Sequence, residues 1–161
     1  AVTFVVYALF LWVNYRIAVR QTRYSSFSFF EDNPFSDYVN KGANLIALVF
    51  ICFVAFSAAS ISTPAWETTL KYLHSTAFGN RDPIFQKDIS FYIFNLPLYE
   101  TIWNWFLFLF LGAFAVSFLI YILKDSLTMR RNGRNILNGK AKSHLSLLMA
   151  VIIGLIAVNF W

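Results

Sequence analysis

Four long apolar stretches without charged residues dominate this chain. No charged residue lies between Gly42 and Trp66 or between Thr101 and Leu123. Each of these stretches exceeds the roughly 20 apolar residues that a helix needs to cross the hydrocarbon core of a bilayer. The chain also begins and ends within uncharged apolar stretches. The pattern predicts an all-α, polytopic helical membrane protein. The expected transmembrane segments are 1–15, 43–63, 98–123 and 144–161, with the first and last truncated in a fragment of a larger protein.

Composition excludes several classes of protein. Hydrophobic residues make up 58% of the chain and charged residues 13%, against about 25% charged in soluble domains, so a soluble fold would expose large apolar patches. The net charge of +5 comes from loops beside the apolar stretches, which favours membrane orientation over nucleic-acid binding. Cys52 is the single cysteine, which excludes an intrachain disulfide and a multi-cysteine metal site. We therefore expect the lipid bilayer as a partner, and no nucleic acid, cofactor or metal.

The loops between the apolar stretches differ in basic charge. Lys and Arg number four in loop 16–42, three in loop 67–100 and six in loop 124–144. Short cytoplasmic loops retain Lys and Arg, so the first and third loops are predicted inside a bacterial cell membrane and residues 64–97 outside it. Trp66, Trp103, Trp105 and Trp161 would then lie near the outer interface, where indole rings are enriched. Trp12 would lie near the inner interface.

The start of the second loop has the pattern of a short amphipathic helix. Thr63 precedes Pro64, and these residues are typical of an N-cap and a first helical position. Apolar residues then recur at helical spacing until a Gly-Asn pair, which is a stop signal. These residues are Trp66, Leu70, Leu73 and Ala77. The helix is predicted to lie on the outer membrane surface; the alternative is a straight extension of the preceding transmembrane helix.

The stretch after this helix combines turn-forming, charged and aromatic residues. Asp82 and Asp88 lie beside turns, where a carboxylate can accept hydrogen bonds from unpaired backbone N–H groups. We expect segment 82–97 to be a structural cap over the outer helix ends, with its aromatic side chains buried there and its cations near headgroup phosphates. The expected cap or headgroup contacts are Arg81, Asp82, Lys87, Asp88, Phe91 and Tyr92. Together with His74, the charged residues Arg81, Asp82, Lys87 and Asp88 could instead form an acid–base site or hold an anionic headgroup. On the opposite side, Arg130, Arg131 and Arg134 are candidate contacts for anionic lipids.

The same stretch resembles the uncharacterised protein family UPF0182, whose members are large bacterial membrane proteins. The resemblance rests on a Trp, a Phe-Gly pair, Asp-Pro-x-Phe, and Asp-Ile-Ser-Phe-Tyr-x-Phe-x-Leu-Pro. The matching residues are Trp66, Phe78, Gly79, Asp82, Pro83, Phe85, Asp88, Ile89, Ser90, Phe91, Tyr92, Phe94, Leu96 and Pro97. The resemblance implies about seven N-terminal helices followed by a large extracytoplasmic domain. This chain would cover the second to fifth helices. The resemblance supplies no catalytic residue.

Three functions are compatible with the sequence. The leading hypothesis is a non-catalytic module that anchors an extracytoplasmic domain or joins a membrane assembly with other membrane proteins. The second is a transporter or channel component, although we expect no ionisable residue inside the apolar stretches, where such proteins usually carry them. The third is an envelope or lipid-acting enzyme that uses the second loop. No catalytic residue is assigned.

Overall fold

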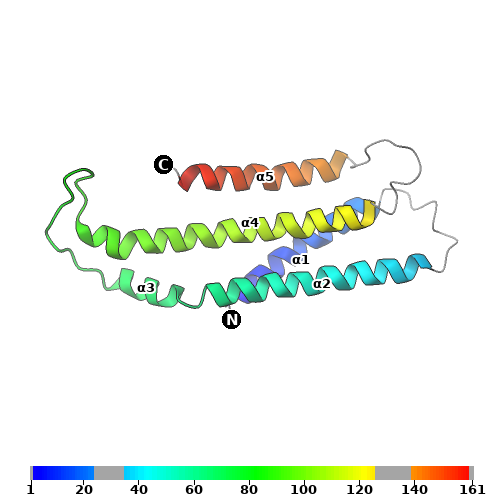
Figure 1. The fold of residues 1–161 in the computed structure, drawn as a ribbon, viewed down its shortest axis with the longest axis horizontal. Helices are drawn as coiled ribbons and strands as arrows, with labels where there is room; N and C mark the ends of the chain where they lie inside the picture. The colour runs from blue at the N-terminus through cyan, green and yellow to red at the C-terminus, as the bar shows by residue number, and fades with distance from the viewer. Residues whose placement is uncertain (1, 24–34, 126–138, 160–161) are drawn as a thin grey trace.

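The computed structural model describes residues 2–23, 35–125 and 139–159, and it describes them as helices joined by short connections (Figure 1). The α-helices are α1 (Val2–Arg23), α2 (Phe35–Ile61), α3 (Ala65–Leu73), α4 (Leu96–Asp125) and α5 (Gly139–Asn159). A π-helical turn, η1 (Phe91–Asn95), precedes α4. Among the described residues, four segments are long and apolar enough to cross a membrane: Val2–Thr22, Asn44–Ile61, Phe91–Ile122 and Gly139–Asn159. The all-α class with four candidate spans is therefore confirmed. The candidate lipid contacts Arg130, Arg131 and Arg134 lie outside the described residues.

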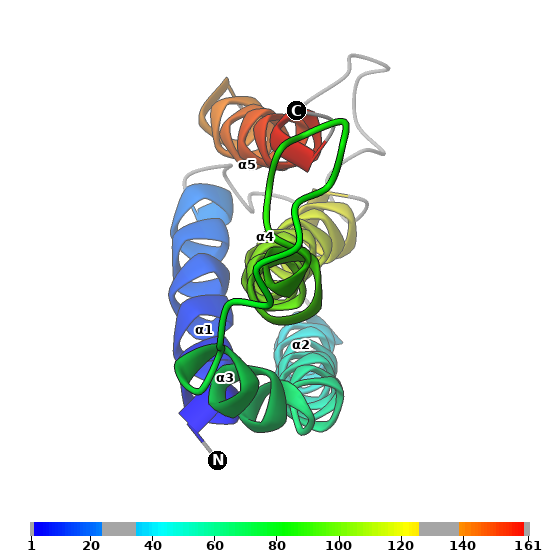
Figure 2. The ribbon, with the colours of Figure 1, turned by 90° about the vertical axis from the view of Figure 1, so that its left-hand side faces the viewer.

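Helix α4 is the central helix of the bundle. Helices α1, α2 and α5 surround it, and α1 is inclined to the other three (Figure 2). Buried apolar side chains from all four helices meet in one cluster, formed by Leu11, Ile51, Ala113, Val116 and Leu148. Because this cluster joins α5 and α1 through α4, the four helices form one packed unit.

Small residues allow the close approach of α2 and α4. Ala55, Ala113 and Ser117 are fully buried at helix contacts, as expected for helices that pack in lipid. On α5, however, Ala150 and Gly154 are exposed. The small-residue pair of α5 therefore faces away from the described bundle, together with many large apolar side chains. Such an outward apolar surface suits a lipid environment.

Two helices extend beyond the uncharged stretches. Helix α1 continues from Tyr15 to Arg23 and so includes residues that we expected in a loop. Helix α2 starts at Phe35, well before Gly42. Charged residues do not end a helix by themselves, because long cationic side chains can lie along it with the charge in a polar region. The guanidinium of Arg16, for example, lies over the ring of Trp12 at 5.2 Å from the ring centre.

The connection from α2 to α3 differs from the expected cap. Thr63 does not cap α3, because its hydroxyl donates to the carbonyl of Ala59 at 3.3 Å. Pro64 occupies the N-cap position with helical backbone angles. Ser62 likewise donates to the carbonyl of Ala58 at 2.7 Å. The chain bends here, and α3 passes across the end of the bundle against α4 and η1 rather than continuing straight along α2 (Figure 2).

The helix that contains α4 begins earlier than expected. Residues 91–97, expected as part of an aromatic loop, are helical and join η1 to α4 without a break. Proline lacks an N–H group, and its ring clashes with the carbonyl of the residue four positions before it in a regular α-helix. The wider π turn at Phe91–Asn95 ends two residues before Pro97, and local π adjustments allow a membrane helix to accept a proline. The carbonyl of Pro97 in turn accepts a hydrogen bond from the hydroxyl of Thr101 at 2.7 Å.

Candidate functional site

Two arrangements of polar side chains lie at opposite ends of the bundle. The first is a cluster of four side chains from three helices, which we call the polar cluster: Asn14 and Gln21 of α1, Tyr121 of α4 and His144 of α5. The Tyr121 hydroxyl lies 2.8 Å from Oε1 of Gln21 and 2.9 Å from Nδ1 of His144. Nε2 of His144 lies 3.3 Å from Oδ1 of Asn14. Asn14 donates its amide to the Phe10 carbonyl at 2.8 Å, which fixes Oδ1 as the atom facing the imidazole.

The hydrogen bonds of the polar cluster are compatible with two protonation states of His144. The Tyr121 hydroxyl has one hydrogen and can serve only one of its two neighbours as a donor. If His144 carries both ring protons, the imidazolium donates to Tyr121 and Asn14, and Tyr121 donates to Gln21. If His144 is neutral with its proton on Nε2, Tyr121 donates to His144, and the Gln21 amide must turn to donate to Tyr121. The cluster can therefore be fully hydrogen-bonded in either state.

Sequence reasoning missed the polar cluster. We expected no ionisable side chain between the helices, placed Gln21 in a loop, and treated His144 only as an end of a loop. Asn14 and Gln21 share one face of α1 because they are seven residues apart, which is close to two helical turns. That spacing was the available signal, but it becomes visible only once α1 is known to continue to Arg23.

Removing the Tyr121 hydroxyl should measure what the polar cluster contributes to stability. In the complete protein, Tyr121→Phe is expected to lower the free energy of unfolding by about 0.6–1.7 kcal/mol, the range found for interhelical hydrogen bonds in membranes. Tyr99→Phe is the matched control, since Tyr99 lies on the same helix and is exposed. Unfolding in detergent with increasing denaturant would give both values. Equal stability of the two variants would show that the cluster contributes nothing.

The second arrangement is a hairpin at the opposite end, residues 80–89. Asp82 donates its amide to the carbonyl of Lys87 at 2.8 Å, and Ile89 donates to Asn80 at 3.0 Å. The turn between them is closed by the amide of Phe85, which donates to Oδ2 of Asp82 at 2.9 Å. Figure 1 shows this hairpin beyond the end of α4.

Asp88 joins the hairpin to the segments on either side of it. Its carboxylate accepts backbone hydrogen bonds from Phe78 at 3.2 Å, Gly79 at 2.9 Å and Ser90 at 2.8 Å. Gly79 has a positive φ of 77°, which glycine adopts without strain. One side chain thus connects the end of the α3 region, the hairpin and the start of the helix that leads into α4.

These hydrogen bonds make the hairpin sensitive to acid. The amide and hydroxyl of Ser90, followed by the amides of Phe78 and Gly79, hold the pKa of the Asp88 carboxyl below its ordinary value of 3.8. A lowered folded pKa stabilises the fold above pH 3.8, and this contribution is lost as the pH falls from there through the folded pKa. We expect amide hydrogen exchange at Gly79 and Ser90 to speed up in that window. Asp88→Asn should remove this pH dependence; an unchanged profile would show that another group controls it.

The aromatic residues of this region are only partly packed. The ammonium of Lys87 lies over the ring of Phe91, 4.3 Å from the ring centre. The ring centres of Phe91 and Tyr99 are 6.3 Å apart. Tyr92 donates to Oδ2 of Asp82 at 3.2 Å. Phe85, however, is 71% exposed, and the neighbouring Ile84 is 78% exposed. Our expectation that Phe85 is buried against helix ends is therefore wrong; the turn, which Gln86 completes with a positive φ of 57°, directs these two side chains outward.

The geometry of this end of the bundle gives little support to an acid–base site. His74 bonds to the carbonyl of Leu70 within its own helix, at 3.0 Å. The carboxylates of Asp82 and Asp88 already accept the hydrogen bonds described above. Among the described residues, no group of three His, Cys, Asp or Glu side chains is placed to bind a metal ion. This end of the bundle therefore has the organisation of a hydrogen-bonded structural element.

Comparison with known proteins places the chain in a family. The model of the uncharacterised protein family UPF0182 matches residues 1–161. The chain belongs to this family. A UPF0182 protein of Trichodesmium erythraeum is 45% identical over 158 residues, which are 98% of this chain and 17% of the relative. One of Sulfurovum sp. is 34% identical over 76% of this chain and 13% of the relative. No solved structure matches.

The UPF0182 match confirms the resemblance inferred from the Asp-Pro-x-Phe and Asp-Ile-Ser-Phe-Tyr stretches. The chain spans about 17% and 13% of the length of those two relatives. It therefore corresponds to a small part of much longer proteins. The described part of the chain has four candidate spans, and the relatives come from bacteria. The chain is therefore a multi-pass membrane region of a larger protein. The lipid bilayer is therefore one of its partners.

Proposed function

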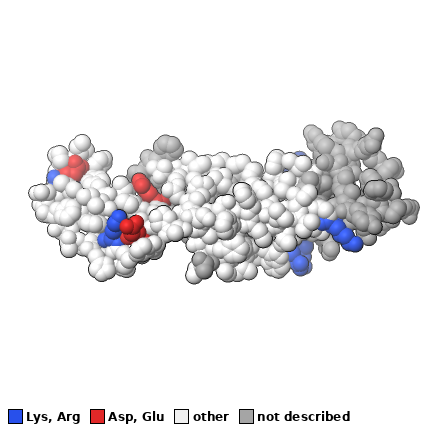
Figure 3. Space-filling view, turned by 60° about the horizontal axis from the view of Figure 1, so that its bottom comes forward, with Lys and Arg blue, Asp and Glu red and all other residues white. Residues whose placement is uncertain are grey.

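We propose that this UPF0182 region is a non-catalytic membrane module that anchors an extracytoplasmic part of the complete protein. In this proposal residues 64–97 lie outside the bacterial cell membrane, and the basic regions 16–42 and 124–144 lie on the inner side. The distribution of charge supports this orientation. Acidic side chains gather at the end formed by α3, the hairpin and the start of α4, and Lys and Arg side chains are visible toward the other end, beside the part drawn in grey (Figure 3). Cations retained at one end are typical of the cytoplasmic side.

The observation that carries the proposal is the length of the α4 span. Its 32 residues, Phe91–Ile122, correspond to about 48 Å at 1.5 Å per residue, whereas the hydrocarbon core is about 30 Å thick. A tilt of roughly 50° would be needed to submerge it, beyond the 0–40° range of membrane helices. Part of this helix therefore extends beyond the hydrocarbon core into the headgroup region, and the hydrogen-bonded hairpin is attached to one end of it.

The hairpin offers an apolar contact surface at its tip. Ile84 and Phe85 are strongly exposed, while the backbone behind them is held by Asp82 and Asp88. An ordered turn with two large exposed apolar side chains is suited to docking onto another protein surface. The chain corresponds to less than a fifth of the relatives' length, and we propose that the tip docks onto the remaining part of the complete protein.

Photocrosslinking tests this proposal in the complete protein in intact cells. Phe85 is replaced by the photoreactive p-benzoylphenylalanine, and the matched control carries it at Phe56, a similarly exposed aromatic position inside the α2 span. The expected product at position 85 is an adduct with a peptide of the same protein outside residues 1–161. The control should react mainly with lipid. If position 85 gave only lipid adducts, the tip would lie in the membrane interface and the anchoring proposal would fail.

A transport component is the second candidate function, and the polar cluster favours it. Ionisable residues between transmembrane helices frequently mark ion or proton pathways, and His144 lies between α1 and α4 with two alternative hydrogen-bond patterns. Proton flux into vesicles that contain the complete protein would test this candidate. A flux abolished by His144→Phe, in a variant of unchanged folded yield, would favour transport over anchoring.

A further inference from the structure

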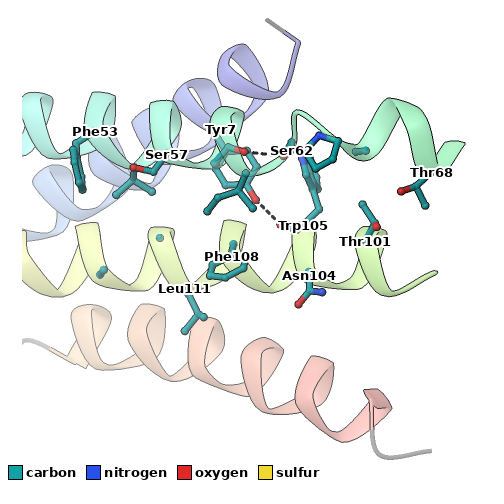
Figure 4. A pocket seen from close by; sticks show the side chains of 17 residues that line it. Tyr7, Phe53, Ser57, Ser62, Thr68, Thr101, Asn104, Trp105, Phe108 and Leu111 are labelled. Carbon is teal, nitrogen blue, oxygen red and sulfur yellow. Dashed lines mark hydrogen bonds between the residues drawn. The ribbon is translucent and has the colours of Figure 1, made fainter. Parts of the chain in front are cut away.

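A groove runs between α2 and α4 and is closed at one end by α3 (Figure 4). Its volume is about 650 Å³, which lies in the range of roughly 300–1,000 Å³ that is typical of small-molecule sites. The groove is distinct from both the polar cluster and the hairpin. Its floor includes Tyr7 and Trp105, whose rings pack edge to face with their centres 5.2 Å apart. The Tyr7 hydroxyl donates a hydrogen bond to the backbone carbonyl of Trp105 at 2.6 Å.

The lining of the groove changes from polar to apolar along its length. Hydroxyl and amide groups gather near α3, and aromatic and aliphatic side chains line the part deeper in the α2 and α4 spans (Figure 4). The polar end contains Ser62, Thr68, Thr101 and Asn104; the apolar end contains Phe53, Val54, Phe108, Leu111 and Ala115, together with the hydroxyl of Ser57. No charged side chain is among the residues that line the groove. This gradient runs in the same direction as the polarity of a lipid that lies in one leaflet.

The polar end has unused hydrogen-bonding capacity. The hydroxyls of Ser62 and Thr101 donate to carbonyls of their own helices and leave their oxygen atoms as acceptors. The hydroxyl of Thr68 and the amide of Asn104 have no hydrogen-bond partner within the described part of the chain. Near a membrane interface, an unpaired amide or hydroxyl is costly. The side chains of Thr68 and Asn104 both line the groove, so a lipid whose ester and phosphate oxygens lie along this end can accept hydrogen bonds from them.

The contact between α2 and α4 favours an alkyl chain over a helix as the occupant of the groove. Helices α2 and α4 contact each other, so the groove is a cleft between packed helices. A helix is about 10 Å across and could lie over this cleft but could not enter it. An extended alkyl chain can enter it.

We propose that the groove binds a phospholipid, with one acyl chain between α2 and α4 and the glycerol ester region at Thr68 and Asn104; its place in the outer leaflet rests on the orientation proposed above. The neutral donors recognise ester and phosphate oxygens, and the aromatic side chains of Phe53 and Phe108 contact the chain. The site therefore recognises the ester region and acyl chain of a phospholipid and does not select a particular charged headgroup.

Lipid photolabelling in detergent tests the proposal on the complete protein. The probe is a phosphatidylglycerol with a photoreactive diazirine in one acyl chain, and the labelled peptides are mapped while unlabelled phosphatidylglycerol competes. We expect saturable labelling of the peptide that contains Phe108 and Leu111. Ala115→Trp, which fills the apolar end, should reduce this labelling at least about tenfold. Leu48→Trp adds the same bulk at an exposed position of α2 outside the groove and should leave it unchanged.

A second pair of variants separates ligand recognition from folding. Thr68→Val and Asn104→Leu remove the donors with little change in size, and each should raise the probe concentration that gives half-maximal labelling by about tenfold while the thermal midpoint stays the same. Labelling that does not saturate, or that is unaffected by Ala115→Trp, would overturn the proposal. A crosslink from p-benzoylphenylalanine at Leu111 to another segment of the same protein would also overturn it, because a helix would then cover the groove.

Discussion

Leu11→Ala is expected to lower the free energy of unfolding of the complete protein by about 2–5 kcal/mol, the usual cost of truncating a buried leucine. Leu11 has no exposed surface and packs in the cluster where α1, α2, α4 and α5 meet. The surrounding side chains come from four different helices, so they cannot collapse into the cavity without moving whole helices. Lost packing contacts would therefore dominate the effect.

Leu9→Ala is the matched control for this prediction. Leu9 lies on the same helix and is 59% exposed, so its truncation exchanges contacts with lipid and creates no cavity. Titration with a denaturing detergent, read out by tryptophan fluorescence, would compare the two variants. If both variants lost the same stability, the inclined packing of α1 against α4 would be wrong.

Gly112→Leu should be the second strongly destabilising change, by roughly 1–3 kcal/mol or more, because the helices pack too closely to accept a side chain. A Cβ atom at Gly112 would lie 3.1 Å from Cγ1 of Val54 and 3.4 Å from Cδ2 of Leu11. Val54 has one preferred rotamer in a helix and cannot turn away easily. The backbones of α2 and α4 would have to separate.

Gly154→Leu provides the control for Gly112→Leu. No atom lies within 4 Å of a Cβ at Gly154, so the same substitution meets open space in the described bundle and gains helix propensity. Thermal unfolding of the two variants in one detergent should differ clearly. A Gly154→Leu variant that is as unstable as Gly112→Leu would show that another helix of the complete protein packs on this face of α5.

The number and type of helices could be predicted because lipid imposes a simple rule. An uncharged apolar stretch of membrane length must satisfy its own backbone hydrogen bonds, and a helix does this within the segment. The residues at which the helices begin and end were less predictable. Arg16 stacks on Trp12 and α1 continues past it, and Pro97 is accommodated by a π turn, so neither a charge nor a proline marked the actual helix end.

The hairpin and the polar cluster both contain long-range hydrogen bonds that could not be predicted from the sequence. The Asp-Ile-Ser stretch indicated that Asp88 could accept backbone hydrogen bonds nearby, and it does so from Ser90. The bond to Phe78 spans ten residues and depends on the path of the whole connection. The contact between Asn14 and His144 joins residues 130 positions apart, and only the packing of α5 against α1 and α4 brings them together. Long-range polar contacts of this kind leave no local pattern.

Cysteine labelling tests the central claim, that this region spans the membrane with the hairpin outside, most directly. In the complete protein, Cys52 and any further cysteine are removed, and either Arg81→Cys in the hairpin or Lys142→Cys near the start of α5 is introduced; both native side chains are exposed. A membrane-impermeant maleimide is added to intact cells and, separately, to permeabilised ones. We predict that position 81 is labelled in intact cells and position 142 only after permeabilisation. Labelling of position 142 in intact cells, with position 81 reacting only after permeabilisation, would contradict the account.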